Sequence, residues 1–281
     1  MRAAFMRYVV IGNPVAHSRS PQIHSAFAAQ FGLADFQYER LLLPVDGFTE
    51  GLCRFVADGG GGCNVTLPFK EEAWRCCDRL SERARAAQAV NTIRVEPNGK
   101  LYGDNTDGAG LVADLLRHVS LAGKRILLLG AGGAARGVIL PLAAEKPAEI
   151  VIANRTAAKA QELAQAFSGQ AGVPLSGMDF DAVSGAFDVV VNATSASIGG
   201  NALPLPAGVF APGALAYDMY YSADETAFLQ QARESGAAIR LDGLGMLVGQ
   251  AAEAFFLWTG FRPEVAPVLA ELRTSLQGGT K

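Results

Sequence analysis

The sequence lacks a long hydrophobic run, which argues against a membrane-spanning protein. Its longest apolar stretch, residues 243–258, is interrupted by a glutamine and a glutamate and does not reach the ~20 residues that span a bilayer. The first eleven residues contain two arginines and no apolar core with a small-residue cleavage site, so they do not resemble a signal peptide. We expect a cytoplasmic protein with no membrane partner.

The sequence also has no basic excess and few metal-binding side chains. The 24 basic and 27 acidic residues give a net charge of −3, whereas nucleic-acid binding usually shows as a basic excess. The four cysteines form no Cys-x-x-Cys pair, and there are only three histidines. We therefore expect no nucleic-acid partner, no metal site and reduced cytosolic thiols.

What the sequence does have is an alternation of β-rich and helical segments over 281 residues, a length that suggests about two domains. The first series has expected strands at 7–11, 37–43, 63–67 and 90–95 and helices at 21–31, 45–57 and 69–87. The second has strands at 126–129, 149–153, 187–191, 215–219 and 238–241, helices at 131–144, 157–167 and 224–234, and terminal helices at 244–259 and 263–275. This order predicts two α/β units with largely parallel sheets. The mixed charges of residues 71–85 indicate a solvated helix face.

A glycine-rich turn opens the second unit. Residues 130–135, Gly-Ala-Gly-Gly-Ala-Ala, follow a short apolar strand and begin a helix, which is the context that supports a G-x-G-x-x-A nucleotide motif. The first glycine allows the tight turn, the second lets the backbone approach a pyrophosphate, and the small Ala135 lets helix and strand pack closely. The predicted cofactor contacts in this turn are Gly130, Ala131, Gly132, Gly133 and Ala134.

The end of the next strand indicates which dinucleotide is bound. NAD-binding proteins place an acidic residue there for the ribose 2′-hydroxyl, but this sequence has Asn154, Arg155 and Thr156, with Lys159 one turn later. A guanidinium binds a 2′-phosphate through charge-assisted hydrogen bonds. We therefore predict that the cofactor is NADP and that Thr156 also serves as a helix N-cap.

Short polar segments lie outside the nucleotide unit: Ser-Arg-Ser-Pro at 18–21, Asn-Val-Thr-Leu-Pro-Phe-Lys at 64–70, Asn-Thr at 91–92 and Asp-Asn-Thr-Asp-Gly at 104–108. Each has an ordinary explanation as a cap or turn. Lys70 does not, because Pro68 suits a first helical turn and the helix dipole disfavours a cation there. Residues that break a local rule are expected at functional sites, and a nearby Asp107 would hold the lysine in place.

Together with Tyr-Asp-Met at 217–219 and Asp-Gly-Leu-Gly-Met-Leu at 242–247, these motifs closely resemble, in order and spacing, the NADP-dependent shikimate dehydrogenases of the shikimate/quinate dehydrogenase family. The resemblance runs from about residue 10 to residue 269. It implies the NADPH-dependent, reversible reduction of 3-dehydroshikimate to shikimate in aromatic amino-acid (chorismate) biosynthesis. It also implies a substrate domain of residues 1–106 plus 250–281 and a Rossmann-like NADP-binding domain of residues 107–249, with the C-terminal helices returning to the first.

The resemblance assigns roles residue by residue. Lys70 and Asp107 would be the catalytic pair. The other substrate-binding residues would be Ser18, Ser20, Asn64, Thr66, Asn91, Tyr221 and Gln250. Besides the glycine-rich turn and residues 154–159, the cofactor-side residues would be Thr194, Met219, Gly243 and, more weakly, Glu82.

The resemblance has one departure and leaves alternatives open. The family usually has glycine where this chain has Ser197, and serine does not adopt glycine's backbone angles freely, so the resemblance does not define the shape of that cofactor-side loop. A quinate/shikimate dehydrogenase that uses NAD is one alternative, against which Arg155 argues. A non-catalytic NADP-binding sensor is another, and it would have no need of Lys70 and Asp107. The chain would act on a small-molecule substrate as a monomer or a homodimer.

Overall fold

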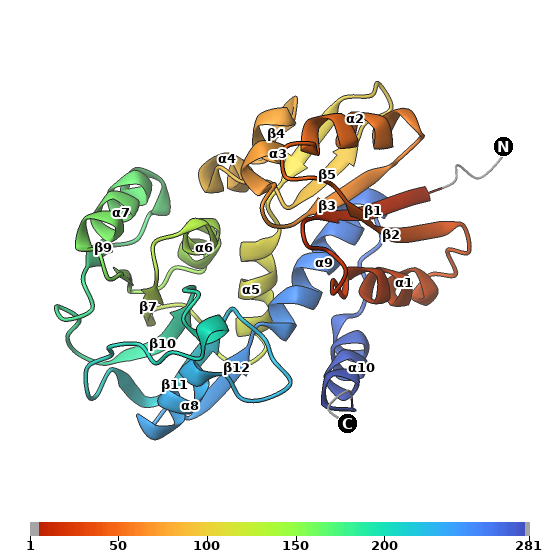
Figure 1. The fold of residues 1–281 in the computed structure, drawn as a ribbon. Helices are drawn as coiled ribbons and strands as arrows, with labels where there is room; N and C mark the ends of the chain where they lie inside the picture. The colour runs from red at the N-terminus through yellow and green to blue at the C-terminus, as the bar shows by residue number, and fades with distance from the viewer. Residues whose placement is uncertain (1–5, 279–281) are drawn as a thin grey trace. The chain divides into compact units, whose positions relative to one another are not determined.

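A computed structural model describes residues 6–278, which divide into two compact units (Figure 1). Unit 1 contains the described residues up to Gly110 together with Val248–Leu269, and unit 2 contains Leu111–Leu247 together with the described residues from Ala270 onward. Each unit has its own six-stranded sheet and its own helices. The prediction of two α/β units, with a C-terminal segment returning to the first, is confirmed.

The sheet of unit 1 has the strand order β2-β1-β3-β5-β6-β4. Its strands are β1 (Met6–Gly12), β2 (Phe36–Leu42), β3 (Gly62–Val65), β4 (Arg79–Leu80), β5 (Thr92–Val95) and β6 (Leu101–Asp104). β1 is parallel to β2 and β3, but β5 is antiparallel to both β3 and β6. The expectation of a largely parallel sheet is therefore confirmed, and among the described strands of this unit β5 alone runs the other way. β5 and β6 form a hairpin whose turn contains Gly99 at a φ of +78°.

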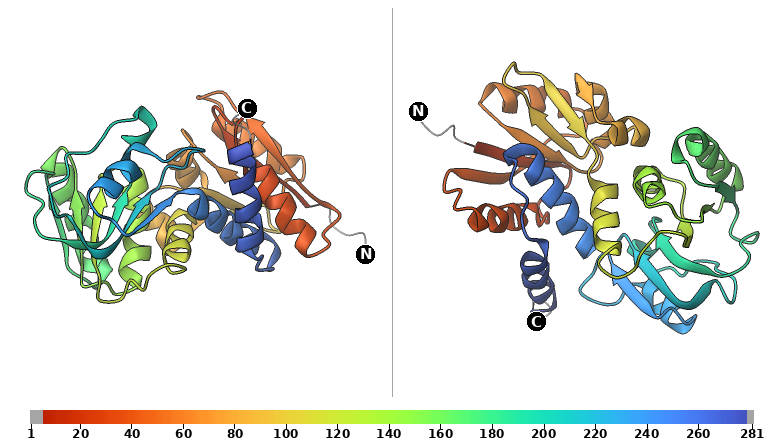
Figure 2. Two further views of the ribbon diagram at one scale, coloured as in Figure 1. Left: turned by 90° about the horizontal axis from the view of Figure 1, so that it is seen from below. Right: turned by 180° about the vertical axis from the view of Figure 1, so that it is seen from behind.

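The strands of unit 1 bury both faces because their side chains alternate. Val9 and Ile11 belong to the core that α2 (Phe48–Ala57) and α3 (Lys70–Cys76) cover. Tyr8 and Val10 point the other way, where Trp258 packs. In Figures 1 and 2, α2 and α3 accordingly lie on one side of this sheet and α1 (Ser20–Gln30) on the other.

The single helix predicted over residues 69–87 is wrong. Cys77 is extended, with φ −80° and ψ 134°, and ends α3. β4 follows, and α4 (Glu82–Ala87) starts after Ser81, whose hydroxyl accepts a hydrogen bond from the amide of Ala84 at 3.1 Å. This N-cap satisfies one of the amides that a helix start leaves open.

The sheet of unit 2 is wholly parallel, in the order β12-β11-β10-β7-β8-β9. Its strands are β7 (Arg125–Leu129), β8 (Glu149–Ala153), β9 (Leu175–Met178), β10 (Phe187–Asn192), β11 (Phe210–Asp218) and β12 (Ile239–Asp242). The chain order reverses between β7 and β10, and ligands of such sheets bind at the carboxyl ends of the strands at this point. The central strands are buried on both faces, as β7 shows with four fully buried residues.

The helices of unit 2 are α6 (Gly133–Ala144), α7 (Ala157–Ala171), α8 (Ala227–Glu234) and the short η1 (Ser197–Gly199). Three helices contain a unit boundary: α5 (Asp107–Leu115), α9 (Leu244–Thr259) and α10 (Val265–Gly278). The described residues after Leu269 belong to unit 2, although the predicted bounds gave them to the substrate domain. Their anchor is Arg273, whose guanidinium donates to both carboxylate oxygens of Asp242 at the end of β12.

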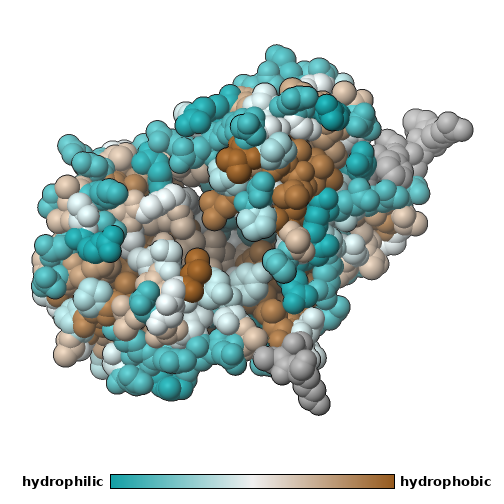
Figure 3. Space-filling model, in the orientation of Figure 1, coloured by the Kyte–Doolittle hydropathy of each residue, from teal (hydrophilic) through white to brown (hydrophobic). Residues whose placement is uncertain are grey.

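Polar and apolar residues are mixed on the surface of the described part that Figure 3 shows. In Figure 3 brown, apolar residues on the visible face lie among teal, polar ones. No helix within residues 6–278 is long and apolar enough to cross a bilayer. All four cysteines are free thiols, and the described residues contain no group of three or more His, Cys, Asp or Glu side chains that would suit a metal ion.

Candidate active site

The structure joins the two predicted catalytic residues of unit 1. Lys70 is the first residue of α3 and Asp107 is the first residue of α5. The Nζ of Lys70 donates to the Oδ2 of Asp107 at 2.6 Å, and the two side chains keep exposed fractions of 28% and 22%. A carboxylate is favoured at a helix N-terminus and an ammonium is not, so this ion pair offsets an otherwise unfavourable lysine.

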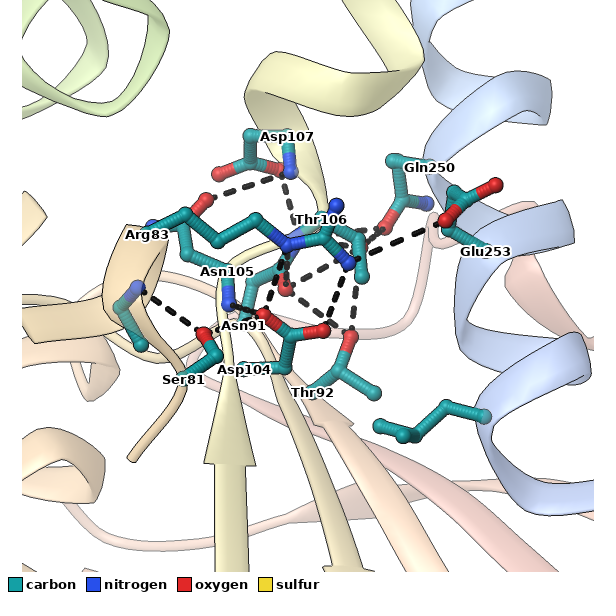
Figure 4. A network of polar contacts seen from close by, with 12 residues as sticks. Ser81, Arg83, Asn91, Thr92, Asp104, Asn105, Thr106, Asp107, Gln250 and Glu253 are labelled. Atoms are coloured by element: carbon teal, nitrogen blue, oxygen red, sulfur yellow. Dashed lines mark hydrogen bonds and ion pairs between the residues drawn. The ribbon is translucent and has the colours of Figure 1, made fainter. Parts of the chain in front are cut away.

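Asn91 fixes the orientation of Asp107 (Figure 4). Its Nδ2 donates to the Oδ1 of Asp107 at 2.7 Å, so both oxygens of that carboxylate are held, one by an amide and one by an ammonium. The Oδ1 of Asn91 accepts from the Thr106 amide and the Thr92 hydroxyl, each at 2.9 Å. The Oε1 of Gln250, from α9, accepts from Asn91 at 3.3 Å and from Thr106 at 3.4 Å. The carboxylate of Asp107 therefore lies in a network of hydrogen bonds that fixes its orientation.

The same network continues to the two serines of the first motif. The Oδ1 of Asn64 accepts from the Tyr38 hydroxyl at 2.6 Å and contacts the Nε2 of His24 at 3.1 Å, while its Nδ2 donates to the Thr92 hydroxyl at 3.0 Å. Ser20 hydrogen-bonds Tyr38, and the hydroxyls of Ser18 and Ser20 are 3.2 Å apart.

Burial keeps the rings of this network uncharged. It lowers the pKa of His24 to about 3 and raises that of Tyr38 well above its ordinary value. The imidazole is therefore neutral, and its Nε2 is the nitrogen that carries the proton toward Asn64.

Three more of the predicted residues have surroundings that do not by themselves indicate binding. Thr66 follows β3, and its methyl group lies so close to Gly12 that a Cβ there would collide with it. Tyr221 belongs to unit 2, where it follows β11 beside Tyr220. Glu82 belongs to unit 1, in the first turn of α4, where the helix dipole alone accounts for a carboxylate. Their roles in binding stay predictions.

Sequence analysis missed a partly buried ion pair next to Asn105 (Figure 4). Arg83 donates to both oxygens of Asp104, at 2.8 and 2.6 Å, and the Ser81 hydroxyl donates to Oδ1 at 2.6 Å. Burial alone would raise the pKa of Asp104, but the hydrogen bonds and charge of Arg83 hold it below its ordinary value. The mixed charges of residues 71–85 predict a solvated position for Arg83 instead. The signal in the sequence that could have indicated the pair is Asp104, the acidic residue that ends β6.

In unit 2 the glycine-rich turn has the geometry that a pyrophosphate needs. Gly130 has a φ of +105°, and a Cβ there would lie 3.1 Å from the Cγ2 of Thr194. Space is open at Gly132 and Gly133, so a ligand can approach the backbone. α6 begins there with no side-chain cap and no acidic residue in its first turn. Its free amides and dipole favour an anion, and the turn therefore fits the phosphates of NADP.

The end of β8 supplies the positive charge. Arg155 and Lys159 are exposed, and within residues 6–278 neither forms an ion pair. Thr156 stands at the N-cap position of α7 but makes no side-chain cap bond, which corrects the predicted capping role. Instead Asn154 donates to the backbone oxygen of Thr156 at 3.0 Å. This helix start too has open donors and no carboxylate, as a 2′-phosphate requires.

The carboxyl ends of β10, β11 and β12 complete this side. Gly243 packs so closely on the Met219 carbonyl that no side chain fits there. The amide of Met219 donates to the backbone oxygen of Asn192 at 3.0 Å. The Thr194 hydroxyl donates to the Oδ1 of Asn192 at 2.7 Å. The structure therefore places Thr194, Met219 and Gly243 at the edge of the sheet where the glycine-rich turn lies.

Ser197 does not need a glycine's backbone. Left-handed non-glycine residues within the described chain are limited to Gln88 and Lys146. The Ser197 hydroxyl donates to the Oδ2 of the buried Asp218 at 2.5 Å and accepts from the Nδ2 of Asn192 at 3.3 Å. The departure from the family pattern therefore adds a hydrogen bond to this loop.

A parallel sheet with a glycine-rich turn at its reversal point, in a chain that also carries a lysine–aspartate pair, defines the class: a dinucleotide-dependent oxidoreductase of two α/β units. Three family profiles match in order: a shikimate dehydrogenase substrate binding domain at residues 10–93, a shikimate/quinate 5-dehydrogenase domain at 112–198 and a shikimate 5′-dehydrogenase C-terminal domain at 243–273.

Relatives narrow the class. An NADP(+)-dependent shikimate dehydrogenase of Dechloromonas aromatica is 60% identical over 272 residues, covering 96% of this chain and 98% of the relative. One of Cupriavidus taiwanensis is 55% identical over 290 residues, covering 100% and 97%. The crystal structure of shikimate 5-dehydrogenase from Thermus thermophilus with NADP(H) and shikimate has a TM-score of 0.82 at 33% identity, covering 96% and 100%. This chain belongs to the shikimate dehydrogenase family.

Proposed function

We propose that this chain catalyses the NADPH-dependent, reversible reduction of 3-dehydroshikimate to shikimate in chorismate and aromatic amino-acid biosynthesis. The observation that carries the proposal is the 2.6 Å pair of Lys70 and Asp107, held by Asn91, in a chain that also has an NADP-type nucleotide unit. Relatives at 55–60% identity are named for this NADP-dependent reaction.

The nucleotide unit binds NADP through its open donors. The backbone at Gly132 and Gly133 meets the pyrophosphate, and Arg155 with Lys159 binds the 2′-phosphate. Thr194, Met219 and Gly243 border the nicotinamide, which supplies or accepts the hydride. Arg155 favours NADP over NAD because NADP alone carries the 2′-phosphate. Within residues 6–278 no carboxylate pairs with Arg155, so its charge is available for that phosphate.

Unit 1 binds the substrate and moves the proton. In the reduction, Nζ of Lys70 gives its proton to the alkoxide oxygen that forms as the carbonyl is reduced, and in the oxidation it takes that proton back. Asp107 holds the ammonium and accepts a hydrogen bond from a substrate hydroxyl. Asn64 and Asn91 have both amide hydrogens engaged within the protein, so we assign them mainly to positioning. Ser18, Ser20 and Thr66 supply hydroxyl groups for the substrate.

The test is the near-ultraviolet absorbance of NADPH, followed with purified protein, NADP and shikimate, and then with NAD and with quinate. We expect turnover with shikimate and NADP and far less with either replacement. Equal use of quinate and NAD would favour the quinate/shikimate alternative. No turnover with any pair, together with tight NADPH binding, would favour a sensor. Size-exclusion chromatography with light scattering would separate a monomer from a homodimer.

A further inference from the structure

Helix α1 begins among positive charges that nothing in the described chain neutralises. Arg19 is its N-cap residue, and its first turn has no acidic residue and no side-chain cap bond. Within residues 6–278, neither Arg19 nor Arg40 has a carboxylate at ion-pair distance. Cations are unfavourable at a helix N-terminus. Arg19 and Arg40 therefore bring positive charge to this helix start without an acidic residue paired to either.

Arg40 reaches this helix start from the neighbouring strand. It lies on β2 two residues after Tyr38, so it points to the same face of the sheet, one step nearer the carboxyl edge. Its Nε and Nη2 donate to the backbone oxygen of Ser18 at 3.1 and 2.7 Å. A guanidinium normally pairs its fork with a carboxylate, but here it holds a neutral carbonyl and keeps its charge.

The hydroxyls beside it are neutral. The Oγ of Ser18 is 3.2 Å from the Oγ of Ser20 and 3.3 Å from the amide of Ser20. Hydroxyls orient a carboxylate but do not balance its charge, whereas a cation within one Debye length, ~8 Å at physiological salt, does. The serines would therefore orient a carboxylate, and the arginines would balance its negative charge.

We propose that Arg40 is a positioning residue of the substrate's carboxylate subsite, which holds the Ser18 loop in shape and, with Arg19, provides the positive charge that the serines lack. The inference rests on the proposed function, because it takes the carboxylate of shikimate as the anion. It gives Arg40 and Arg19 a part beside Ser18 and Ser20, which the resemblance places among the substrate-binding residues.

The test compares shikimate with its uncharged methyl ester. For the wild type and Arg40→Gln, kcat/KM is measured with both compounds at saturating NADP; where the ester is not turned over, its inhibition constant against shikimate replaces kcat/KM. We expect Arg40→Gln to lose about 10-fold with shikimate, mostly in KM, and less than about 2-fold with the ester, because a charge-assisted interaction is lost only for the acid. The salt dependence of kcat/KM for shikimate should also flatten.

Two further variants separate charge, geometry and folding. Arg40→Lys keeps the charge and loses the fork, so we expect an intermediate loss with shikimate. Arg54→Gln removes an exposed arginine of α2 that is already paired with Glu50 at 3.1 Å, and we expect neither the acid-to-ester ratio nor the salt dependence to change. Tryptophan fluorescence checks that each variant is folded.

The outcomes are distinguishable. An equal loss with acid and ester in both Arg40 variants would mean a structural role, and no loss with either would remove Arg40 from the subsite. Each overturns the inference and leaves the function standing, provided that the wild type turns over shikimate. A wild type without that activity would overturn the proposed function, and the inference with it.

Discussion

The two units build their halves of the chemistry in opposite ways. In unit 1 the polar side chains are already bonded to one another, as Asn91 is to Asp107 at 2.7 Å and to Thr106 at 3.0 Å. In unit 2 the donors are left open, because α6 and α7 start without side-chain cap bonds or acidic residues. A closed network fixes the geometry of reacting groups, whereas open donors gain their partners only from a ligand. We therefore expect damage in unit 1 to appear in turnover and damage in unit 2 to appear in cofactor binding.

We expect the largest effect from Lys70→Ala, which tests whether damage in unit 1 appears in turnover. General acid–base groups contribute about 10²–10⁴-fold, so we expect kcat to fall by at least about 10²-fold while NADPH binding, titrated by the fluorescence of the nucleotide, is unchanged. Lys70→Arg should not restore turnover, because a guanidinium does not release its proton near neutral pH.

The control for this variant is Lys100→Ala, which removes an exposed lysine from the β5–β6 turn of the same unit and should behave as wild type. Near-normal kcat with only a raised KM for shikimate would make Lys70 a binding residue. Proton transfer would then be assigned to Asp107 or to water. The expectation that damage in unit 1 appears in turnover would be wrong for this residue.

Arg155→Ala tests the open side. A charge-assisted contact contributes roughly 1.5–3 kcal/mol, so we expect NADPH use to weaken by about 10- to 100-fold and NADH use to change little. Arg233→Ala, in which the lost arginine is exposed and paired with Glu225 at 2.6 Å, should change neither. An equal loss with both cofactors would show that Arg155 does not read the phosphate.

Asp104→Asn tests how much the closed network of unit 1 contributes to the stability of that unit. The buried carboxylate accepts from Arg83 and Ser81, and we expect unit 1 to lose about 2 kcal/mol at neutral pH. Both tryptophans, Trp74 and Trp258, lie in unit 1, so urea unfolding followed by their fluorescence reports this unit alone.

The pH dependence follows from the sign of the shift. The folded-state pKa of Asp104 is lowered, so its stabilisation is present above the unfolded value of about 3.9 and is lost as pH falls through the folded one. The difference in the free energy of unfolding between wild type and Asp104→Asn should therefore narrow below about pH 4. A difference that stays constant with pH would mean that packing, rather than the charge of Asp104, is its cause. The control is Asp46→Asn, at an exposed position, which should have the same free energy of unfolding as wild type.

How far the sequence predicts each site follows from the same contrast. The nucleotide turn is a local backbone feature, and its glycines, flanking strand and helix start are contiguous, so a motif describes it. The network of unit 1 joins residues as distant as Asn91 and Gln250. Their contact depends on how the sheet and α9 pack, so the individual bonds were not predictable even where the residues were.

The fold was least predictable at short edge elements. β4 has two residues and becomes a strand only through its pairing with β6, so the apolar pattern of residues 69–87 gave no sign of a break. β9 was missed because its four residues include Gly177, and a glycine in a short segment reads as a loop. The structure explains that glycine, since a Cβ there would collide with the backbone of Ala160 in α7.

The smallest expected effect tests whether unit 2 contains a closed network of its own. Asp218 accepts from Ser197 at 2.5 Å, from Thr226 at 2.6 Å and from Asn192 at 3.1 Å. Burial raises the pKa of Asp218, and these hydrogen bonds act against the rise. Ser197→Ala removes one of them and should cost about 1 kcal/mol of stability, with at most a few-fold weaker NADPH binding.

The contribution of Asp218 to stability has the opposite sign to that of Asp104, because a raised folded-state pKa means that ionising this carboxyl costs stability. Without the Ser197 donor the pKa rises further, so the loss is full at neutral pH and disappears in acid once the carboxyl is protonated in both states. Thermal unfolding followed by circular dichroism, from neutral to acidic pH, measures this loss of stability. The control is Ser195→Ala, at an exposed serine of the same loop. Weaker NADPH binding with unchanged stability would instead place the Ser197 hydroxyl among the open donors of unit 2, so that the cofactor, rather than Asp218, is its principal partner.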